Sequence, residues 1–137
     1  MIHIQRIVYP TDFSSYSTQA YFHAVGLAEQ YGAALSIVFA LNAATDEKNR
    51  GKAYWEAQLA DVRPLNAKIA VTHAILEGDA ATEIVRYATD QRADVIVIGT
   101  HGRTGVDRLV LGSVAERVMR EAPCSVLVVK LAKGGRS

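Results

Sequence analysis

The chain has 137 residues, half of them hydrophobic, so we expect a single domain with one substantial core. Its 15 basic and 14 acidic side chains leave a net charge of +1, which argues against nucleic acid or an anionic membrane surface as a partner. No apolar run approaches the roughly 20 residues of a membrane-spanning helix. Met1 to Tyr9 lacks the apolar core of a secretory signal, so a cytoplasmic protein is expected.

The first predicted strand runs from His3 to Tyr9 and is stopped by Pro10. A helix follows, with Asp12 or Ser14 as its N-cap. Gly32 ends this helix as a left-handed cap. The residues at helical spacing that predict its buried face are Ala20, Ala24, Leu27, Ala28 and Tyr31.

The second predicted strand, Leu35 to Ala40, is almost continuously apolar, as expected of a buried parallel strand. The pattern is weakest from Asn42 to Pro64, where a short second helix is predicted from the spacing of Trp55, Leu59 and Val62. In the third predicted strand, Ile69, Val71 and Ile75 alternate with smaller or polar residues. This alternation predicts a strand at the edge of the sheet.

The third helix is predicted to begin after Asp79, which can cap it. Its buried face is predicted to contain Ala81, Ile84, Val85 and Ala88. The run from Val95 to Ile98 has no polar face, which predicts a central parallel strand covered on both sides.

The last helix is predicted from Val114 to Glu121, opened by Ser113 and ended by Pro123. Its buried stripe is predicted to be Val114, Val118 and Ala122. A fifth strand is predicted from Ser125 to Lys130, with Cys124 before it as a small buried hydrophobe. The alternation of strands and helices predicts an α/β domain at residues 1–130 with a mainly parallel sheet, and residues 131–137 are expected to form a polar C-terminal tail.

A long loop rich in glycine joins the fourth strand to the last helix. Gly99 and Gly102 begin it, and Gly112 with Ser113 ends it at a helix start. Missing β-carbons and free helix amides are typical of a phosphate site, so the loop predicts an anion cradle. An alternative to phosphate binding is a capping box, because Ser113 and Glu116 have the spacing at which two side chains satisfy the amides of a helix start without a ligand.

This glycine spacing resembles the nucleotide signature of the ATP-binding branch of the universal stress protein family. Ile7 to Ser14 (IVYPTDFS) resembles the family's first strand and turn, and Pro123 to Lys130 (PCSVLVVK) resembles its last strand. The resemblance implies a single open five-stranded sheet of order 3-2-1-4-5 with helices on both faces, similar to adenine nucleotide α-hydrolases. In that order, the ends of strands one and four face one crevice at the point where the topology reverses.

The resemblance also implies a site for ATP, with any Mg²⁺ carried by the triphosphate rather than by a protein cage. Asp12 could accept a hydrogen bond from a ribose hydroxyl or an adenine amine, although a helix cap is nearly as good a role for it. Arg103 or His101 would supply donors to anionic oxygens. The nucleotide-binding residues implied are Pro10, Asp12, Ala40, Gly99, Thr100, His101, Gly102, Arg103, Thr104, Gly105, Gly112, Ser113, Val114 and Ala115.

No residue of the loop stands out as a catalytic base, and His101 is better suited to donate to phosphate or backbone. We therefore expect a stress-response binding module that acts through nucleotide-dependent conformation and dimer contacts. Two alternatives stay open: an enzyme that hydrolyses ATP slowly, and a dimeric interaction scaffold that binds no nucleotide. His73 has no second ligand at useful spacing, so no metal site is predicted.

The fifth strand also predicts a homodimer. It is apolar throughout and lacks the charge or proline that usually protects a sheet edge. Two copies would meet along this edge, a pairing that also resembles the family, through Val126, Leu127, Val128 and Val129.

Overall fold

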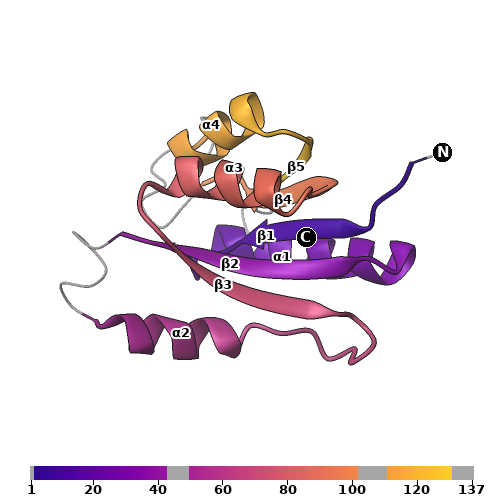
Figure 1. Ribbon diagram of the computed structural model, residues 1–137, viewed down its shortest axis with the longest axis horizontal. Coiled ribbons are helices and arrows are strands. Elements are labelled where there is room, and N and C mark those ends of the chain that lie inside the picture. Colours follow the sequence, from indigo (N-terminus) through magenta and orange to yellow (C-terminus); the bar gives the residue numbers. More distant parts are fainter. Residues whose placement is uncertain (1, 43–49, 102–110, 131–137) are drawn as a thin grey trace.

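The computed structural model describes residues 2–42, 50–101 and 111–130, which form one parallel sheet covered by helices (Figure 1). Its strand order is β3-β2-β1-β4-β5, so the predicted α/β class and the order 3-2-1-4-5 are confirmed. Along the chain the elements are β1 (Arg6–Pro10), α1 (Ser15–Tyr31), β2 (Ala34–Leu41), α2 (Lys52–Ala60), β3 (Val71–Glu77), α3 (Ala80–Asp90), β4 (Val95–Gly99), α4 (Ser113–Glu121) and β5 (Ser125–Val129).

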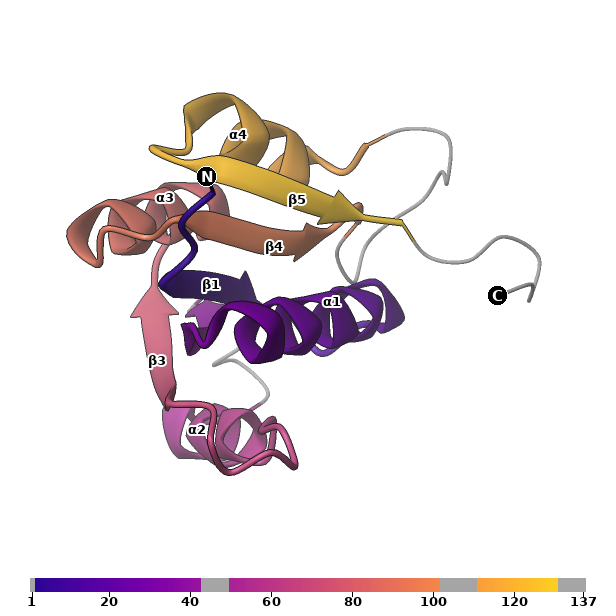
Figure 2. The ribbon, with the colours of Figure 1, turned by 90° about the vertical axis from the view of Figure 1, so that its right-hand side faces the viewer.

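The helices lie on both faces of the sheet, as predicted. Figure 2 shows α1 and α2 on one side and α3 and α4 on the other. Side chains alternate between two cores, so that Ile7 and Tyr9 enter the core beneath α1 while Val8 enters the core beneath α3 and α4. None of the described helices is both long and apolar enough to cross a membrane.

The start of β1 differs from the prediction of a strand from His3, because pairing with β2 begins only at Arg6. The carboxylate of Asp94, just before β4, accepts the backbone amides of Gln5 and Arg6 at 2.8 and 2.9 Å. At the other end Pro10 is the last strand residue rather than the first residue beyond it. The strand is therefore shorter and shifted by one residue at its end.

The helix α1 buries Ala20, Ala24 and Ala28, as predicted. Tyr31 does not share this face, since 42% of it is exposed. Gly32 has φ +62 and turns the chain at the helix end, and it is Ala33 that re-enters the core. The predicted left-handed cap at Gly32 is confirmed, while the prediction that Tyr31 lies on the buried face is wrong.

The predicted short second helix is present as α2, with Gly51 at its N-cap. Leu59 is buried and Trp55 is partly buried against the α1-side core. β3 lies at one edge of the sheet, as its alternating pattern predicted. Its His73 is partly buried, with Nε2 2.8 Å from the carbonyl oxygen of Val62, which agrees with a structural role.

On the other face, Asp79 caps α3 through the amide of Thr82 at 3.1 Å, as predicted. In α4 the most buried residues are Ala115 and Val118, and Ala115 was absent from the predicted stripe. Cys124 packs partly buried against this core, and burial raises the pKa of its thiol. β5 ends at Val129, one residue before the prediction, and the predicted tail 131–137 lies outside the described residues.

Candidate functional site

The candidate site lies at the carboxyl edge of the two central strands. β1 pairs with β2 on one side and with β4 on the other, all in parallel, so their last residues reach the same edge. The chain order reverses between β1 and β4, and such a reversal is where open α/β sheets bind ligands.

The ends of β1 and β2 bring two of the predicted nucleotide-binding residues, Pro10 and Ala40, to this edge. Pro10 is buried and pairs in register with Val38, and Ala40 lies two residues further along β2, partly buried. The amide of Thr11 donates to the carbonyl oxygen of Val38 at 2.8 Å, which holds the chain to β2 just beyond the strand. Each strand therefore carries a small apolar residue at this edge.

The predicted alternatives for Asp12 and Ser14 are resolved at the start of α1. Ser14 is the N-cap, and its hydroxyl accepts the amide of Ser17 at 3.3 Å. Asp12 accepts the amide of Ser14 at 3.0 Å, so its carboxylate shapes the turn without being the N-cap. This bond uses one oxygen, Oδ1, of a partly buried carboxylate.

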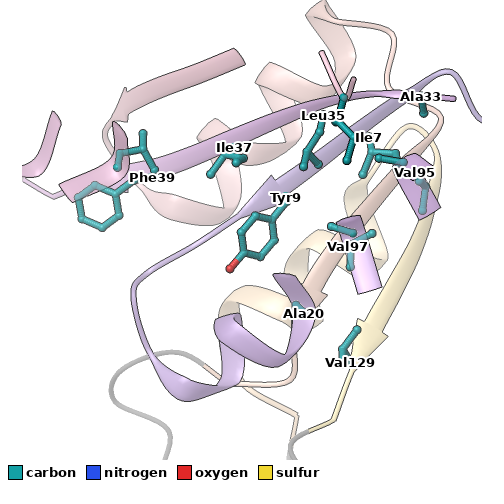
Figure 3. Close-up of a cluster of buried hydrophobic side chains, with 14 of the residues drawn as sticks. Ile7, Tyr9, Ala20, Ala33, Leu35, Ile37, Phe39, Val95, Val97 and Val129 are labelled. Atoms are coloured by element: carbon teal, nitrogen blue, oxygen red, sulfur yellow. The ribbon is translucent and has the colours of Figure 1, made fainter. Parts of the chain in front are cut away.

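A buried polar network beneath this turn was missed in the sequence. The hydroxyl of Tyr9 donates to the carbonyl oxygen of Ser17 at 2.6 Å, and Figure 3 shows Tyr9 reaching across the core toward α1. The Ser17 hydroxyl lies 3.1 Å from Thr11 Oγ1. Burial raises the pKa of Tyr9 to about 12, so its proton stays in place over the whole neutral range. The cluster of hydroxyl residues from Thr11 to Thr18 was the available signal.

Gly99, the last residue of β4, is packed closely against the backbone of α1. A Cβ on Gly99 would lie 2.7 Å from the carbonyl oxygen of Tyr16, so the missing side chain lets the first turn of α1 approach β4. His101 is also close to this turn, with its ring centroid 5.0 Å from that of Tyr16. The glycine has a structural role here in addition to any role toward a ligand.

Thr100 links three segments at this edge. Its amide donates to the carbonyl oxygen of Val129 at the end of β5, at 3.1 Å. Its own carbonyl oxygen accepts the amide of Gly112 at 2.7 Å, which brings the start of α4 against the end of β4. A Cβ on Gly112 would lie 2.9 Å from that oxygen. Both glycines at the described ends of the loop therefore permit close backbone approach.

The alternative to a phosphate site, a capping box formed by Ser113 and Glu116, is contradicted at the start of α4. Gly112 is the N-cap and makes no side-chain cap hydrogen bond, and Ser113 is the first helical residue rather than the cap. Glu116 forms an ion pair with Arg120, one turn further along the helix. Since glycine has no side chain to accept a hydrogen bond, the cap leaves the amides of the first turn to other acceptors.

The remaining predicted contacts, Gly102, Arg103, Thr104 and Gly105, lie outside the described residues. Of the fourteen predicted site residues, the ten that are described all come from three places: the ends of β1 and β2, the end of β4, and the first turn of α4. The structure thus brings together at one edge what the sequence separates by about a hundred positions, from Pro10 to Ala115.

Buried polar residues gather at the same edge. In the described part of the chain, the buried polar residues are Thr11, Ser17, Thr100 and His101. Polar groups are rarely buried without a structural or functional reason, so their concentration marks this edge as different from the apolar cores. Within the same residues, no group of three or more His, Cys, Asp or Glu side chains is arranged to hold a metal ion.

The arrangement offers donors to an anion beside small apolar surface, which suits a ligand with a flat apolar part and a phosphate. The α4 amides and the positive end of its helix dipole lie next to the Thr100 backbone. Asp12 supplies an acceptor at the other loop.

Comparison with known proteins identifies a family. The model of the universal stress protein family matches residues 3–130. A universal stress protein of Methanocaldococcus jannaschii is 35% identical over an alignment of 142 residues, gaps included. The alignment covers 94% of this chain and 84% of the relative.

Two solved structures extend the similarity to the whole fold. The protein MJ0577 superposes with a TM-score of 0.83 at 26% identity, covering 97% of this chain and all of that one. A universal stress protein crystallised with cAMP has a TM-score of 0.72 at 26% identity, covering 94% of this chain and 99% of that one.

Proposed function

The chain belongs to the universal stress protein family, and from this premise we propose that it binds an adenine nucleotide, ATP, at the carboxyl edge of β1 and β4. Binding would change the conformation of this edge and the contacts that the protein makes with a second copy. The protein would then act as a regulator in a stress response, with chemistry on the nucleotide unnecessary for that role.

One observation carries the proposal: α4 begins with a cap that makes no side-chain hydrogen bond, held against the end of β4 by the bond from Gly112 to Thr100. Such a helix start presents amide hydrogens and a positive dipole end to one point in space. A phosphate group supplies the acceptors that these amides need. The phosphates would therefore lie at Gly112, Ser113, Val114 and Ala115.

The base and the ribose would lie toward β1 and β2. Pro10 and Ala40 provide small apolar surface for a flat base, and Asp12 an acceptor for a ribose hydroxyl or the adenine amine. The loop residues that follow β4 would bind the ribose and phosphates. We propose for this role Gly99, Thr100, His101, Gly102, Arg103, Thr104 and Gly105.

The structural neighbour crystallised with cAMP supports an adenine nucleotide as the ligand class. ATP itself is the finer part of the proposal, and it rests on the glycine spacing and on the length of the loop between Gly99 and Gly112. Any Mg²⁺ would arrive on the triphosphate, because Mg²⁺ usually keeps several waters and binds through substrate phosphates.

A charge placed at Ser113 tests the phosphate position without harming the helix. Ser113→Asp adds a negative charge at the first helical position, where it interacts favourably with the helix dipole. The same charge repels a phosphate. We expect unchanged or slightly higher thermal stability, and an ATP affinity measured by calorimetry that is at least about tenfold weaker, equivalent to about 1.4 kcal/mol.

Ser113→Ala is the matched control, since it removes the hydroxyl without adding charge, and it should bind ATP like the wild type. ATP at about 100 times its dissociation constant should stabilise the wild type by about 2.7 kcal/mol in a thermal melt. A wild type that neither binds nor is stabilised by millimolar ATP would favour the scaffold alternative. Equal ATP binding by Ser113→Asp and Ser113→Ala would remove the phosphates from α4.

We further propose that the second copy pairs along β5. This strand is an edge of the sheet, and Leu127 on it is 38% exposed. An exposed apolar edge strand is a template for pairing with another chain. Sedimentation at micromolar concentration should show a dimer for the wild type and a monomer for Leu127→Lys, while a wild-type monomer would contradict the proposal.

A further inference from the structure

Phe13, directly after Asp12, has an unfavourable backbone conformation. Its φ is +66, in the left-handed region that aromatic residues rarely adopt. Among the described residues the only other non-glycine residue with positive φ is Arg92. Such strain persists only where surrounding contacts determine the conformation, and it is often found at ligand sites.

Aromatic packing holds Phe13 in this conformation. Its ring centroid lies 5.0 Å from that of Phe39 and 5.6 Å from that of Trp55, with an interplanar angle of 24° to the indole. Phe39 and Trp55 also contact each other, at 5.0 Å. We call these three residues the aromatic cluster. Each pair has the offset or tilted geometry that favours ring contacts.

The cluster joins three elements that are distant in the sequence. Phe39 is 1% exposed near the end of β2, where Figure 3 shows its ring at one end of the core. Trp55 lies in α2, which packs against β2 and β3 and contributes none of the residues proposed to contact the nucleotide. Phe13 belongs to the loop between β1 and α1. The helix α2 therefore contacts this loop through the side chains of the aromatic cluster.

The backbone of Phe13 is also fixed by its neighbours. Its amide donates to Thr11 Oγ1 at 3.1 Å, and Asp12 accepts the amide of Ser14 at 3.0 Å. Since Phe13 is the residue between Asp12 and Ser14, its φ determines how the Asp12 carboxylate is placed relative to the start of α1. A change at Phe13 would redirect Asp12.

We propose that Trp55 is a positioning residue for the nucleotide site: through the aromatic cluster it holds the β1–α1 loop in the conformation that presents Asp12 to the ligand. This inference rests on the proposed function. It makes α2, outside the proposed site, a determinant of nucleotide affinity. It also means that the single tryptophan of the chain reports on the loop, so ATP binding changes its fluorescence.

Comparing Trp55→Leu with Trp55→Phe separates the effect of the aromatic ring from the effect of buried apolar volume. Leucine keeps apolar volume but loses the stacked ring, and phenylalanine keeps an aromatic face toward Phe13. We expect Trp55→Leu to weaken ATP binding about tenfold by calorimetry, within the range known for residues that act at a distance. In the nucleotide-free protein, the amides of Phe13 and Ser14 should exchange faster with solvent. Trp55→Phe should restore most of both properties.

Ile84→Val is the control for general destabilisation. Ile84 is 2% exposed in α3, on the opposite face of the sheet, and loses one methylene group in a core that lacks the aromatic cluster. It should lower the melting temperature while leaving ATP affinity and the exchange of the Phe13 and Ser14 amides unchanged.

Phe13→Gly carries the test if Trp55→Leu does not fold. Glycine adopts φ +66 without strain, so this variant removes the ring and its backbone penalty together. We expect a folded protein with a looser loop and weaker ATP binding. Unchanged affinity in either folded variant overturns the positioning role, even if amide exchange accelerates, and leaves the proposed function standing. A wild type that binds no ATP overturns the proposed function and this inference with it.

Discussion

The backbone amide of Gly112 donates a hydrogen bond to the carbonyl oxygen of Thr100 at 2.7 Å, which fixes the start of α4 against the end of β4. This contact depends on the absence of a side chain at Gly112, because a Cβ would lie 2.9 Å from the same oxygen and 3.1 Å from the Cα of His101. The two described ends of the glycine loop are therefore held together by a hydrogen bond within the protein backbone.

Gly112→Ala should break this contact. The added methyl group meets backbone atoms, which cannot move aside as a flexible side chain can. We expect the free energy of unfolding to fall by about 1–3 kcal/mol, as for other overpacked positions. ATP affinity should fall too, because the α4 amides shift from the end of β4. Urea denaturation and calorimetry measure the two effects, and a variant as stable as the wild type would contradict the close packing.

Gly26→Ala should act in the opposite direction and serves as the matched glycine substitution. Gly26 lies inside α1, where a Cβ would have no heavy atom within 4 Å. Alanine loses less conformational entropy on folding than glycine does, so we expect stabilisation of about 0.5–1 kcal/mol. A higher urea midpoint with an unchanged m value would confirm it. Destabilisation would mean that this face of α1 is covered in solution.

Tyr9→Phe should destabilise the protein by removing the hydrogen bond to the Ser17 carbonyl oxygen. We expect a loss of about 0.5–1.5 kcal/mol at neutral pH. The pKa of Tyr9 is raised from 10.0 to about 12, chiefly by burial, so the folded state keeps a proton that the unfolded state releases. The contribution of Tyr9 is thus complete below pH 10 and is lost as the pH rises toward 12. Urea midpoints of both proteins across this interval should converge, and a constant difference would contradict the raised pKa.

Asp79→Asn tests the charged cap of α3. Hydrogen bonds from the Thr82 hydroxyl and amide, and then from Arg117 at 2.8 Å, lower the pKa of Asp79 below its usual 3.8. A lowered pKa in the folded state stabilises the protein above pH 3.8, and this stabilisation is lost as the pH falls through the folded pKa.

Asparagine still caps the helix but carries no charge, so the variant isolates this pH-dependent part. Because the pair is exposed, we expect a difference of only about 0.2–1 kcal/mol at neutral pH, reduced by salt. Thermal melts in a pH series should show the difference vanishing in acid. A difference that grew as the pH fell would reverse the assigned direction.

Local patterns in the sequence were enough to predict the α/β class and the approximate positions of the helices and strands. The apolar runs at Leu35–Ala40 and Val95–Ile98 have strand propensity and no polar face, and they became the buried strands β2 and β4. The caps at Gly32 and Asp79 depend only on neighbouring residues, and both are confirmed. The strand order came from resemblance to the family rather than from these patterns.

Part of the candidate site could also be predicted from local patterns in the sequence. The spacing of Gly99 and Gly112 identified the loop and the helix start, but it could not show that each glycine makes room for another backbone, Tyr16 in one case and Thr100 in the other. The capping box at Ser113 failed for a related reason. The close approach to Thr100 makes Gly112 the cap and moves Ser113 into the helix.

The sequence by itself determined which segments become strands and helices, because hydrophobic period, glycine and proline act over a few neighbouring residues. Only the tertiary structure decided which distant residues meet, since contacts such as Phe13 with Trp55, or Tyr9 with Ser17, depend on how whole elements pack. The left-handed conformation of Phe13 belongs to this second group, because its aromatic partners come from β2 and α2.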